Sequence, residues 1–328
     1  MKFGITPITG ITDRHFRFMV RLMSKETALY TEPVAAKDIL QADLRDNVLC
    51  YSPEEHPLRL FLTGRNHKTI AEAAKIVEEY GYDGIHIKAF APLERIGAGN
   101  FGVTIIPDAE TTCRCIDAAR QAVKIPLSVD IAISLVGEDF NKEDALKLKR
   151  LIRMVSSAGT DDFVINITRN HARKEKVKLS KAEKTRHDMV YRLQEEYPHL
   201  KFTTYGDVKT FPNALEHLTK TDGVLIGYSV HSNPYMMIDA DKTIFGKDGP
   251  NPSRTEIVES MIEYADRALK EGASIKTIVK HMMGIFNSCE GSRMWKYMLV
   301  EGCSFEDAGS EVLVMALNKL EDKECPYL

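Results

Sequence analysis

Short runs of apolar and β-branched residues alternate with amphipathic stretches from Phe3 to Gly227. The runs predict eight β-strands, at residues 3–8, 28–31, 58–62, 84–88, 126–131, 162–167, 201–205 and 223–227. Apolar positions at helical spacing predict helices between them, at residues 69–80, 111–123, 143–157, 181–197 and 212–220. This alternation is typical of an α/β fold of the closed parallel kind, the (β/α)8 TIM barrel, rather than of an open doubly wound sheet.

The pattern changes after Pro250. Residues 254–320 show helical periodicity with breaks at Gly272, Gly291 and Gly302, and no run among them has the character of a strand. The polar stretch GKDGPNP at residues 246–252 has the composition of a linker. The sequence therefore predicts a TIM-barrel domain over residues 1–245 and a small all-helical C-terminal domain over residues 246–328.

Composition and charge exclude several classes of partner. The chain has 328 residues, of which 44% are hydrophobic and 28% charged, as is usual for a soluble globular protein. The formal net charge of −3 gives no attraction of the whole protein to nucleic acid or anionic lipid, so such binding needs a local patch. Six cysteines are too scattered for a disulfide scaffold, and no apolar run reaches the ~18 residues of a membrane span. We expect a cytoplasmic protein with reduced thiols that does not enter a membrane.

One segment departs from the near-neutral balance. Between Arg169 and Arg192, nine basic residues stand against three acidic ones. The segment follows the predicted strand at residues 162–167, so it should lie at the carboxyl ends of the barrel strands. Its basic side chains could hold the phosphates of an RNA, or could form an ordinary solvated helix of mixed charge. Those that could contact RNA are Arg169, Arg173, Lys174, Lys176 and Lys178.

The carboxyl ends of the strands are where TIM barrels place their chemistry. The loops after the last two predicted strands begin with Gly206 and Gly227, and glycine lets backbone amides approach a phosphate closely. The alternative is that both glycines only turn the chain. No spacing of His, Asp or Glu supports a metal site, so we expect none.

A series of motifs carries a resemblance to a known family. In chain order they are TPITGITDRHFR (6–17), ALYTEPV (28–34), EEHPLRLFLTG (54–64), GYDGIHI (81–87), GNFG (99–102), HARK (171–174), DGVLIGYSVHSNP (222–234) and KHMMGIFNSCEGSRMWKYM (280–298). In this order and spacing the chain resembles the tRNA-dihydrouridine synthase family over nearly its whole length, and its bacterial A-type branch in particular. The resemblance implies an FMN-dependent barrel that reduces the C5–C6 double bond of a uridine in tRNA and uses NADPH to recharge the flavin.

The resemblance also implies how the partner is held. The C-terminal helices would help to bind the tRNA, and the target base would be turned out of its stack into the pocket. Arg95 keeps its register with the family pattern after Pro92 and would contact RNA. We therefore expect tRNA as the partner of a monomer or weak oligomer.

The flavin positions that the resemblance implies are partly substituted. They are Pro7, Thr9, Phe61, Asp130, Asn166, Gly206, Asp207, Gly227 and Tyr228. Phe61 stands where the family has a glutamine on the flavin ring, and Asp130 where it has a lysine beside flavin N1 and O2. Asp207 and Tyr228 replace a glycine and an arginine of the phosphate site. A carboxylate in place of the lysine would repel a reduced flavin by on the order of 1–4 kcal/mol.

The acid of the reaction is substituted too. Ala91 occupies the position of the family cysteine that is taken to protonate the uracil ring, and a methyl group donates no proton. His171, in the HARK motif, is the candidate for a substitute acid.

Three hypotheses follow. In the first, the chain is a tRNA-binding relative in which uridine reduction is impaired or lost, which explains all these substitutions by one cause. In the second, it is a fully active FMN-dependent synthase with a different acid. In the third, it is a repurposed barrel enzyme with another ligand. The substitutions favour the first.

Overall fold

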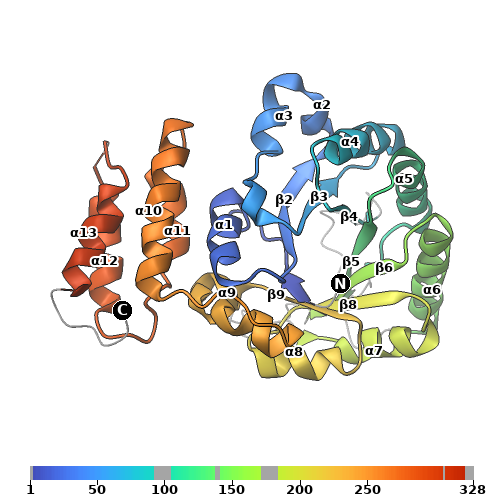
Figure 1. Ribbon diagram of the computed structural model, residues 1–328. Helices are drawn as coiled ribbons and strands as arrows, with labels where there is room; N and C mark the ends of the chain where they lie inside the picture. Colours follow the sequence, from blue (N-terminus) through green and yellow to red (C-terminus); the bar gives the residue numbers. More distant parts are fainter. Residues whose placement is uncertain (1–2, 92–104, 137–140, 171–183, 306, 322–328) are drawn as a thin grey trace. The chain divides into compact units, whose positions relative to one another are not determined.

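The computed structural model describes residues 3–91, 105–136, 141–170, 184–305 and 307–321 (Figure 1). The chain divides into two compact units. The barrel unit comprises Met1–Pro7, Ala28–Tyr51 and His56–Ile226, and the helical unit comprises Ile8–Thr27, Ser52–Glu55 and Gly227–Leu328. The domain boundary expected at residue 245 stays a prediction, since compact packing does not by itself define a domain that folds alone.

The barrel unit is built on a parallel sheet. Its strands within the described residues are β1 (Phe3–Ile5), β2 (Leu29–Ala35), β3 (Leu58–Thr63), β4 (Gly84–Lys88), β5 (Leu127–Val136), β6 (Asp162–Asn170), β7 (Lys184–Thr185), β8 (Lys201–Tyr205) and β9 (Gly223–Ile226). All but β7 pair in the order β1-β9-β8-β6-β5-β4-β3-β2. Backbone bonds from Ile5 N to the Ala28 carbonyl (3.0 Å) and from Ala28 N to the Phe3 carbonyl (3.1 Å) join the first strand to the start of the second. The predicted TIM barrel is confirmed.

The sheet differs from the prediction in where several strands end and in one added strand. Strand β1 ends at Ile5 rather than at residue 8, and β2 continues to Ala35 rather than ending at residue 31. Strands β5 and β6 were expected to end at residues 131 and 167 but continue as a pair to Val136 and Asn170. Strand β7, which was not predicted, pairs antiparallel with β6 through Thr168 and Thr185. A two-residue strand is too short to show any periodicity, which explains why the sequence gives no sign of it.

Helices follow most strands of the barrel unit. They are α2 (Ala36–Leu40), α3 (Ala42–Val48), α4 (His67–Glu79), α5 (Ala109–Ala122), α6 (Lys142–Ser157), α7 (His187–Glu196) and α8 (Phe211–Leu218). Side-chain caps set several starts: Asn66 accepts from two amides of α4, and Asn141 forms a capping box with Asp144 in α6. The helix predicted from residue 181 begins only at His187, because Lys184 and Thr185 pair with β6.

The helical unit joins the two ends of the chain. Its elements are α1 (Arg14–Met23), η1 (Pro53–Glu55), α9 (Tyr228–Ser232), η3 (Pro234–Asp239), η4 (Asp241–Phe245), α10 (Arg254–Lys270), α11 (Ile275–Met282), α12 (Ser292–Gly302) and α13 (Glu311–Glu321). The predicted helical C-terminal region is thus confirmed. Among the helices described, none is long and apolar enough to cross a membrane.

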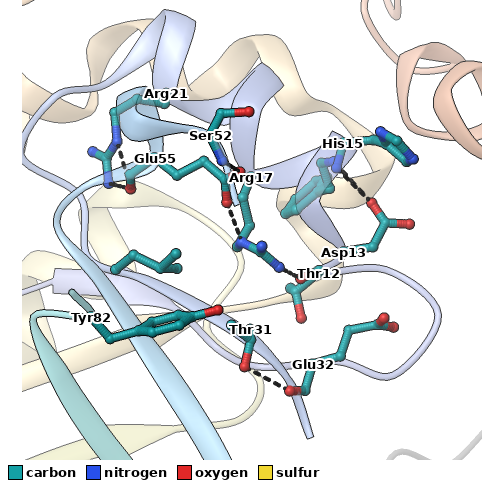
Figure 2. Close-up of polar contacts among 12 residues, drawn as sticks. Thr12, Asp13, His15, Arg17, Arg21, Thr31, Glu32, Ser52, Glu55 and Tyr82 are labelled. Atoms are coloured by element: carbon teal, nitrogen blue, oxygen red, sulfur yellow. Dashed lines mark hydrogen bonds and ion pairs between the residues drawn. The ribbon is translucent and has the colours of Figure 1, made fainter. Parts of the chain in front are cut away.

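Polar contacts of α1 explain why it belongs to this unit. Asp13 caps the helix by accepting from the amides of His15 and Phe16, and its carboxylate lies 2.9 Å from Nε2 of His281 in α11. Nδ1 of His15 lies 2.7 Å from the Tyr264 hydroxyl in α10. Figure 2 shows the buried ion pair between Arg17 Nε and Glu55, at 2.6 Å. An N-terminal helix is therefore bound to C-terminal ones by hydrogen bonds and charge.

Candidate functional site

A polar network fills the barrel interior. Arg59 Nη1 forms an ion pair with Asp162 Oδ2 at 2.9 Å and donates to Ser128 Oγ at 3.2 Å. Ser128 Oγ also lies 2.9 Å from His86 Nδ1, and both His86 and Ser128 are fully buried. Burial lowers the pKa of His86 to about 3, so its ring is neutral at physiological pH. His86 therefore serves as a structural group of the interior rather than as a charged one.

Phe61 packs above this network. It lies on β3, is 5% exposed, and its ring centroid is 4.9 Å from that of His86. Its amide donates to the Thr31 hydroxyl at 2.9 Å. Figure 2 shows that this hydroxyl in turn donates to the Glu32 carbonyl. Phe61 is thus an integral part of the barrel core.

Asp130 is a buried carboxylate that lies beside Lys88 in the register of β4 and β5. It lies within β5, because that strand continues beyond it, and is 7% exposed. Its Oδ1 accepts a hydrogen bond of 2.9 Å from the hydroxyl of Tyr205, the last residue of β8. Burial raises the pKa of Asp130 to about 6, against the opposing effects of the Tyr205 hydrogen bond and the Lys88 charge. The carboxyl is therefore still mostly ionised at neutral pH.

Ala91 is the last described residue of the segment after β4. It is half-buried, and its carbonyl accepts a hydrogen bond of 2.7 Å from Arg65 Nη1. The Arg65 guanidinium lies 5.7 Å from the centre of the Phe90 ring. The backbone at Ala91 is therefore held in place, but its side chain has no group that could transfer a proton.

The loop after β8 has an unusual backbone. Gly206 has φ of +96° and Asp207 has φ of +55°, both in the left-handed region. Asn166, which was expected at a strand end, lies within β6 and pairs with Ala132, since both strands are longer than predicted. Its side chain nevertheless reaches this loop, because Nδ2 of Asn166 would lie 3.1 Å from a Cβ placed on Gly206.

The other predicted flavin positions fall partly in the helical unit. Pro7 is half-buried in the barrel unit. Thr9, Gly227 and Tyr228 belong to the helical unit, where Gly227 precedes α9 and Tyr228 is 68% exposed. Within the barrel unit, the structure therefore brings Asp130 together with Tyr205, and Asn166 together with Gly206.

The predicted RNA contacts lie mostly beyond the structure. The RNA candidates Arg95, Arg173, Lys174, Lys176 and Lys178 lie outside the described residues, as does His171, the candidate for a substitute acid. Arg169 is the residue before the last in β6, which ends at Asn170, and only its backbone is described.

Two polar residues near the strand ends were not predicted. Tyr205 bonds to Asp130, and His187 Nδ1 lies 2.8 Å from the Thr204 hydroxyl. Tyr205 directly precedes Gly206 at the end of a strand, and this position was the available signal for it. His187 begins a helix that the sequence placed six residues earlier, so nothing singled it out.

A closed parallel barrel with buried polar side chains in its interior defines a protein of the TIM-barrel class. Comparison with known proteins identifies the group: a model described as "Dihydrouridine synthase (Dus)" matches residues 4–321, and the chain belongs to this family. It is 33% identical over 326 residues to a tRNA-dihydrouridine(20/20a) synthase of Shewanella oneidensis, covering 97% of this chain and 94% of that one.

Other relatives agree with this assignment. A tRNA-dihydrouridine(20/20a) synthase of Synechocystis sp. is 33% identical over 320 residues, covering 96% and 93% of the two chains. One of Vibrio cholerae is 31% identical over 329 residues, covering 98% of each. Among solved structures, a 2-naphthoyl-CoA reductase in complex with 2-naphthoyl-CoA matches with a TM-score of 0.53 at 9% identity, over 74% of this chain and 50% of that one. At that identity the last match shows the barrel fold alone.

Proposed function

We propose that this chain is a tRNA-binding member of the dihydrouridine synthase family in which FMN- and NADPH-dependent reduction of uridine is impaired or lost. Family membership supports tRNA as the partner, since the relatives are named as tRNA-dihydrouridine synthases. The observation that carries the second half of the proposal is the buried hydrogen bond between Asp130 and Tyr205.

The carboxylate that accepts this hydrogen bond supports the proposal, because the resemblance expects a lysine beside the flavin at this position. Bound FMN would supply the hydride for the uracil ring, and its reduced form carries negative charge at the N1–O2 edge. With a pKa of about 6, Asp130 is roughly nine-tenths ionised at pH 7. Two like charges about 4 Å apart repel by about 4 kcal/mol at an effective dielectric of ~20, which corresponds to roughly a thousandfold loss of affinity for the reduced, anionic flavin.

Two further residues are poorly suited to FMN. Phe61 fills its position with a buried ring that cannot donate a hydrogen bond to the isoalloxazine. Ala91 cannot protonate uracil, and a substitute acid such as His171 stays a prediction. The groups present therefore do not fit the flavin, and we derive no reaction step through it.

The RNA half of the proposal depends on the basic segment. Arg169, Arg173, Lys174, Lys176 and Lys178 would hold tRNA phosphates, so affinity should fall as salt rises. Such a role suits a cytoplasmic protein that acts as a monomer or weak oligomer. We also retain the division into a barrel domain over residues 1–245 and a tRNA-contacting helical domain over residues 246–328.

The test begins with the purified protein. We expect no flavin absorbance, no saturable quenching of FMN fluorescence, and no dihydrouridine in unmodified tRNA incubated with FMN and NADPH. Unmodified tRNA should still bind in a filter assay, with an affinity that falls as salt is added. A yellow protein that forms dihydrouridine would overturn the loss of activity, and absence of tRNA binding would overturn the partner.

Variants at Asp130 and Phe61 test whether these two residues cause the proposed loss of FMN binding. Replacing Asp130 by Lys together with Phe61→Gln should raise the affinity for reduced FMN, because the first change removes the repulsion of its anionic ring and the second restores a hydrogen-bonding group. Asp161→Asn changes a carboxylate that is exposed and paired with Lys201, and should leave FMN affinity unchanged. If the double variant binds FMN no better than the Asp161 control, the charge argument is wrong.

A further inference from the structure

The loop after β8 contains a carboxylate where an anion-binding loop would be expected. Asp207 Oδ2 accepts a hydrogen bond of 3.2 Å from the backbone amide of Thr185. Asp207 adopts φ of +55°, a conformation that aspartate reaches only at some cost. A charge-assisted hydrogen bond from the amide is the kind of contact that offsets this cost.

The backbone amide of Thr185, which donates to Asp207, is held in place by the pairing of its strand. Thr185 belongs to β7 and pairs with Thr168 of β6, and the next amide, that of Arg186, donates to the Ile167 carbonyl at 2.7 Å. These contacts with β6 hold the backbone at Thr185 and Arg186, so the Thr185 amide stays directed at the loop after β8.

Two further donors crowd the same loop. A Cβ placed on Gly206 would lie 2.5 Å from Thr185 Oγ1 and 3.1 Å from Asn166 Nδ2. Thr168 donates its hydroxyl to Asn166 Oδ1 at 2.5 Å, which orients the amide so that its nitrogen faces Gly206. The Thr185 backbone amide therefore contacts the Asp207 carboxylate, while the Thr185 hydroxyl and the Asn166 side-chain amide lie beside the neighbouring Gly206.

These donors form a set suited to an anion. Backbone N–H, hydroxyl and amide groups in a glycine loop at the end of a late barrel strand are the groups that bind phosphate oxygens. We infer that the Asp207 carboxylate is an internal anion that occupies this position and excludes phosphate monoesters from it. The inference deepens the proposed function and rests on it, since it gives a second cause, separate from Asp130, for the loss of FMN.

The inference predicts that removal of one carboxylate creates a phosphate site. The variant Asp207→Gly removes both the charge and the side chain, and glycine adopts φ of +55° without strain. In calorimetry we expect Asp207→Gly to bind inorganic phosphate at least about tenfold more tightly than the wild-type protein does. Asp207→Asn keeps the side chain but not its charge and should fall between the two.

A matched control comes from the other end of the barrel. Asp222 directly precedes β9 and accepts a backbone amide at 3.3 Å from Phe202 of β8. Like Asp207, it is a carboxylate that accepts a backbone amide, so Asp222→Asn removes the same kind of charge at a different place and should not bind phosphate. If Asp207→Gly does not fold, the phosphate affinity of the isosteric variant Asp207→Asn still tests the inference.

The outcomes separate the inference from the proposed function. If neither Asp207 variant binds phosphate more tightly than the wild-type protein, the internal-anion assignment is wrong. Failure of the proposed function would instead appear in unmodified wild-type protein, as FMN binding and dihydrouridine formation. Both Asp207 variants retain Asp130, so neither should restore reduction.

Discussion

Replacing Asp130 by Asn should stabilise the protein at neutral pH, which is unusual for a change at a buried hydrogen-bonded residue. Asn keeps an oxygen that can accept the Tyr205 hydroxyl but carries no charge. The wild-type carboxyl has its pKa raised by burial from the ordinary 3.8 to about 6, so the folded state holds its proton more tightly than the unfolded state. Stability from this group is therefore fully present below pH 3.8 and is lost as pH rises through 6.

The magnitude follows from the two pKa values. A rise from 3.8 to about 6, at about 1.4 kcal/mol for each tenfold change in the proton equilibrium, corresponds to about 3 kcal/mol. The wild type has already lost about 1.5 kcal/mol of this at pH 5 and loses the full amount by about pH 8. The advantage of Asp130→Asn over wild type should thus grow by about 1.5 kcal/mol between those two pH values.

Urea unfolding of both proteins across this pH range measures the difference. Asp161→Asn is the control, because Asp161 is exposed and its hydrogen bond with Lys201 lowers its pKa. Its effect should be small and of opposite sign. A difference between Asp130→Asn and wild type that stays constant from pH 5 to pH 8 would refute the assignment of a raised pKa, and with it the buried charge on which the proposed loss of FMN depends.

Two further changes test the polar interior of each unit. Arg17→Met leaves Glu55 buried without its ion-pair partner and should lower the free energy of unfolding by about 3–5 kcal/mol. The control Arg14→Met breaks an exposed pair with Glu271 and should cost under about 1 kcal/mol. Equal losses in the two variants would contradict the role of burial. His86→Gln should reduce acid sensitivity, because a pKa lowered from 6.5 to about 3 keeps the folded ring neutral while the unfolded chain gains a proton below pH 6.5. At pH 5 the free energy of unfolding of the wild type should therefore be lowered by about 2 kcal/mol, a loss that the variant does not suffer. If the free energies of unfolding of the two proteins change in parallel with pH, this explanation is wrong.

The sequence predicted those parts of the barrel that depend on local periodicity. Strands such as β8 and β9 and helices such as α4 and α6 repeat apolar residues at a regular spacing, and their positions agree with the structure within a few residues. The continuation of β5 was present as alternation at Ile131, Ile133 and Leu135, but only pairing with β6 makes it a strand. The two residues of β7 carry no local signal, since they form a strand only because β6 offers an unpaired edge.

The interior contacts were harder to predict. Which side chains meet across a barrel depends on strand stagger, and a one-residue change in register would turn Tyr205 away from Asp130. The left-handed backbone of Asp207 depends on the amide of Thr185, which lies 22 residues earlier in the chain. The sequence could identify Asp130 and Asp207 as substitutions but could not reveal their partners.

The composition of the helical unit determines when the chain can finish folding during synthesis. Helix α1 is made near the start of translation, yet His281 and Tyr264, which bind Asp13 and His15, come about 250 residues later. At roughly 5–20 residues per second, α1 waits on the order of 10–50 s for these partners. During that interval the apolar face that includes Phe16, Met19 and Val20 has no C-terminal helices to cover it. The ribosome therefore releases a chain whose first helix is among the last to be packed.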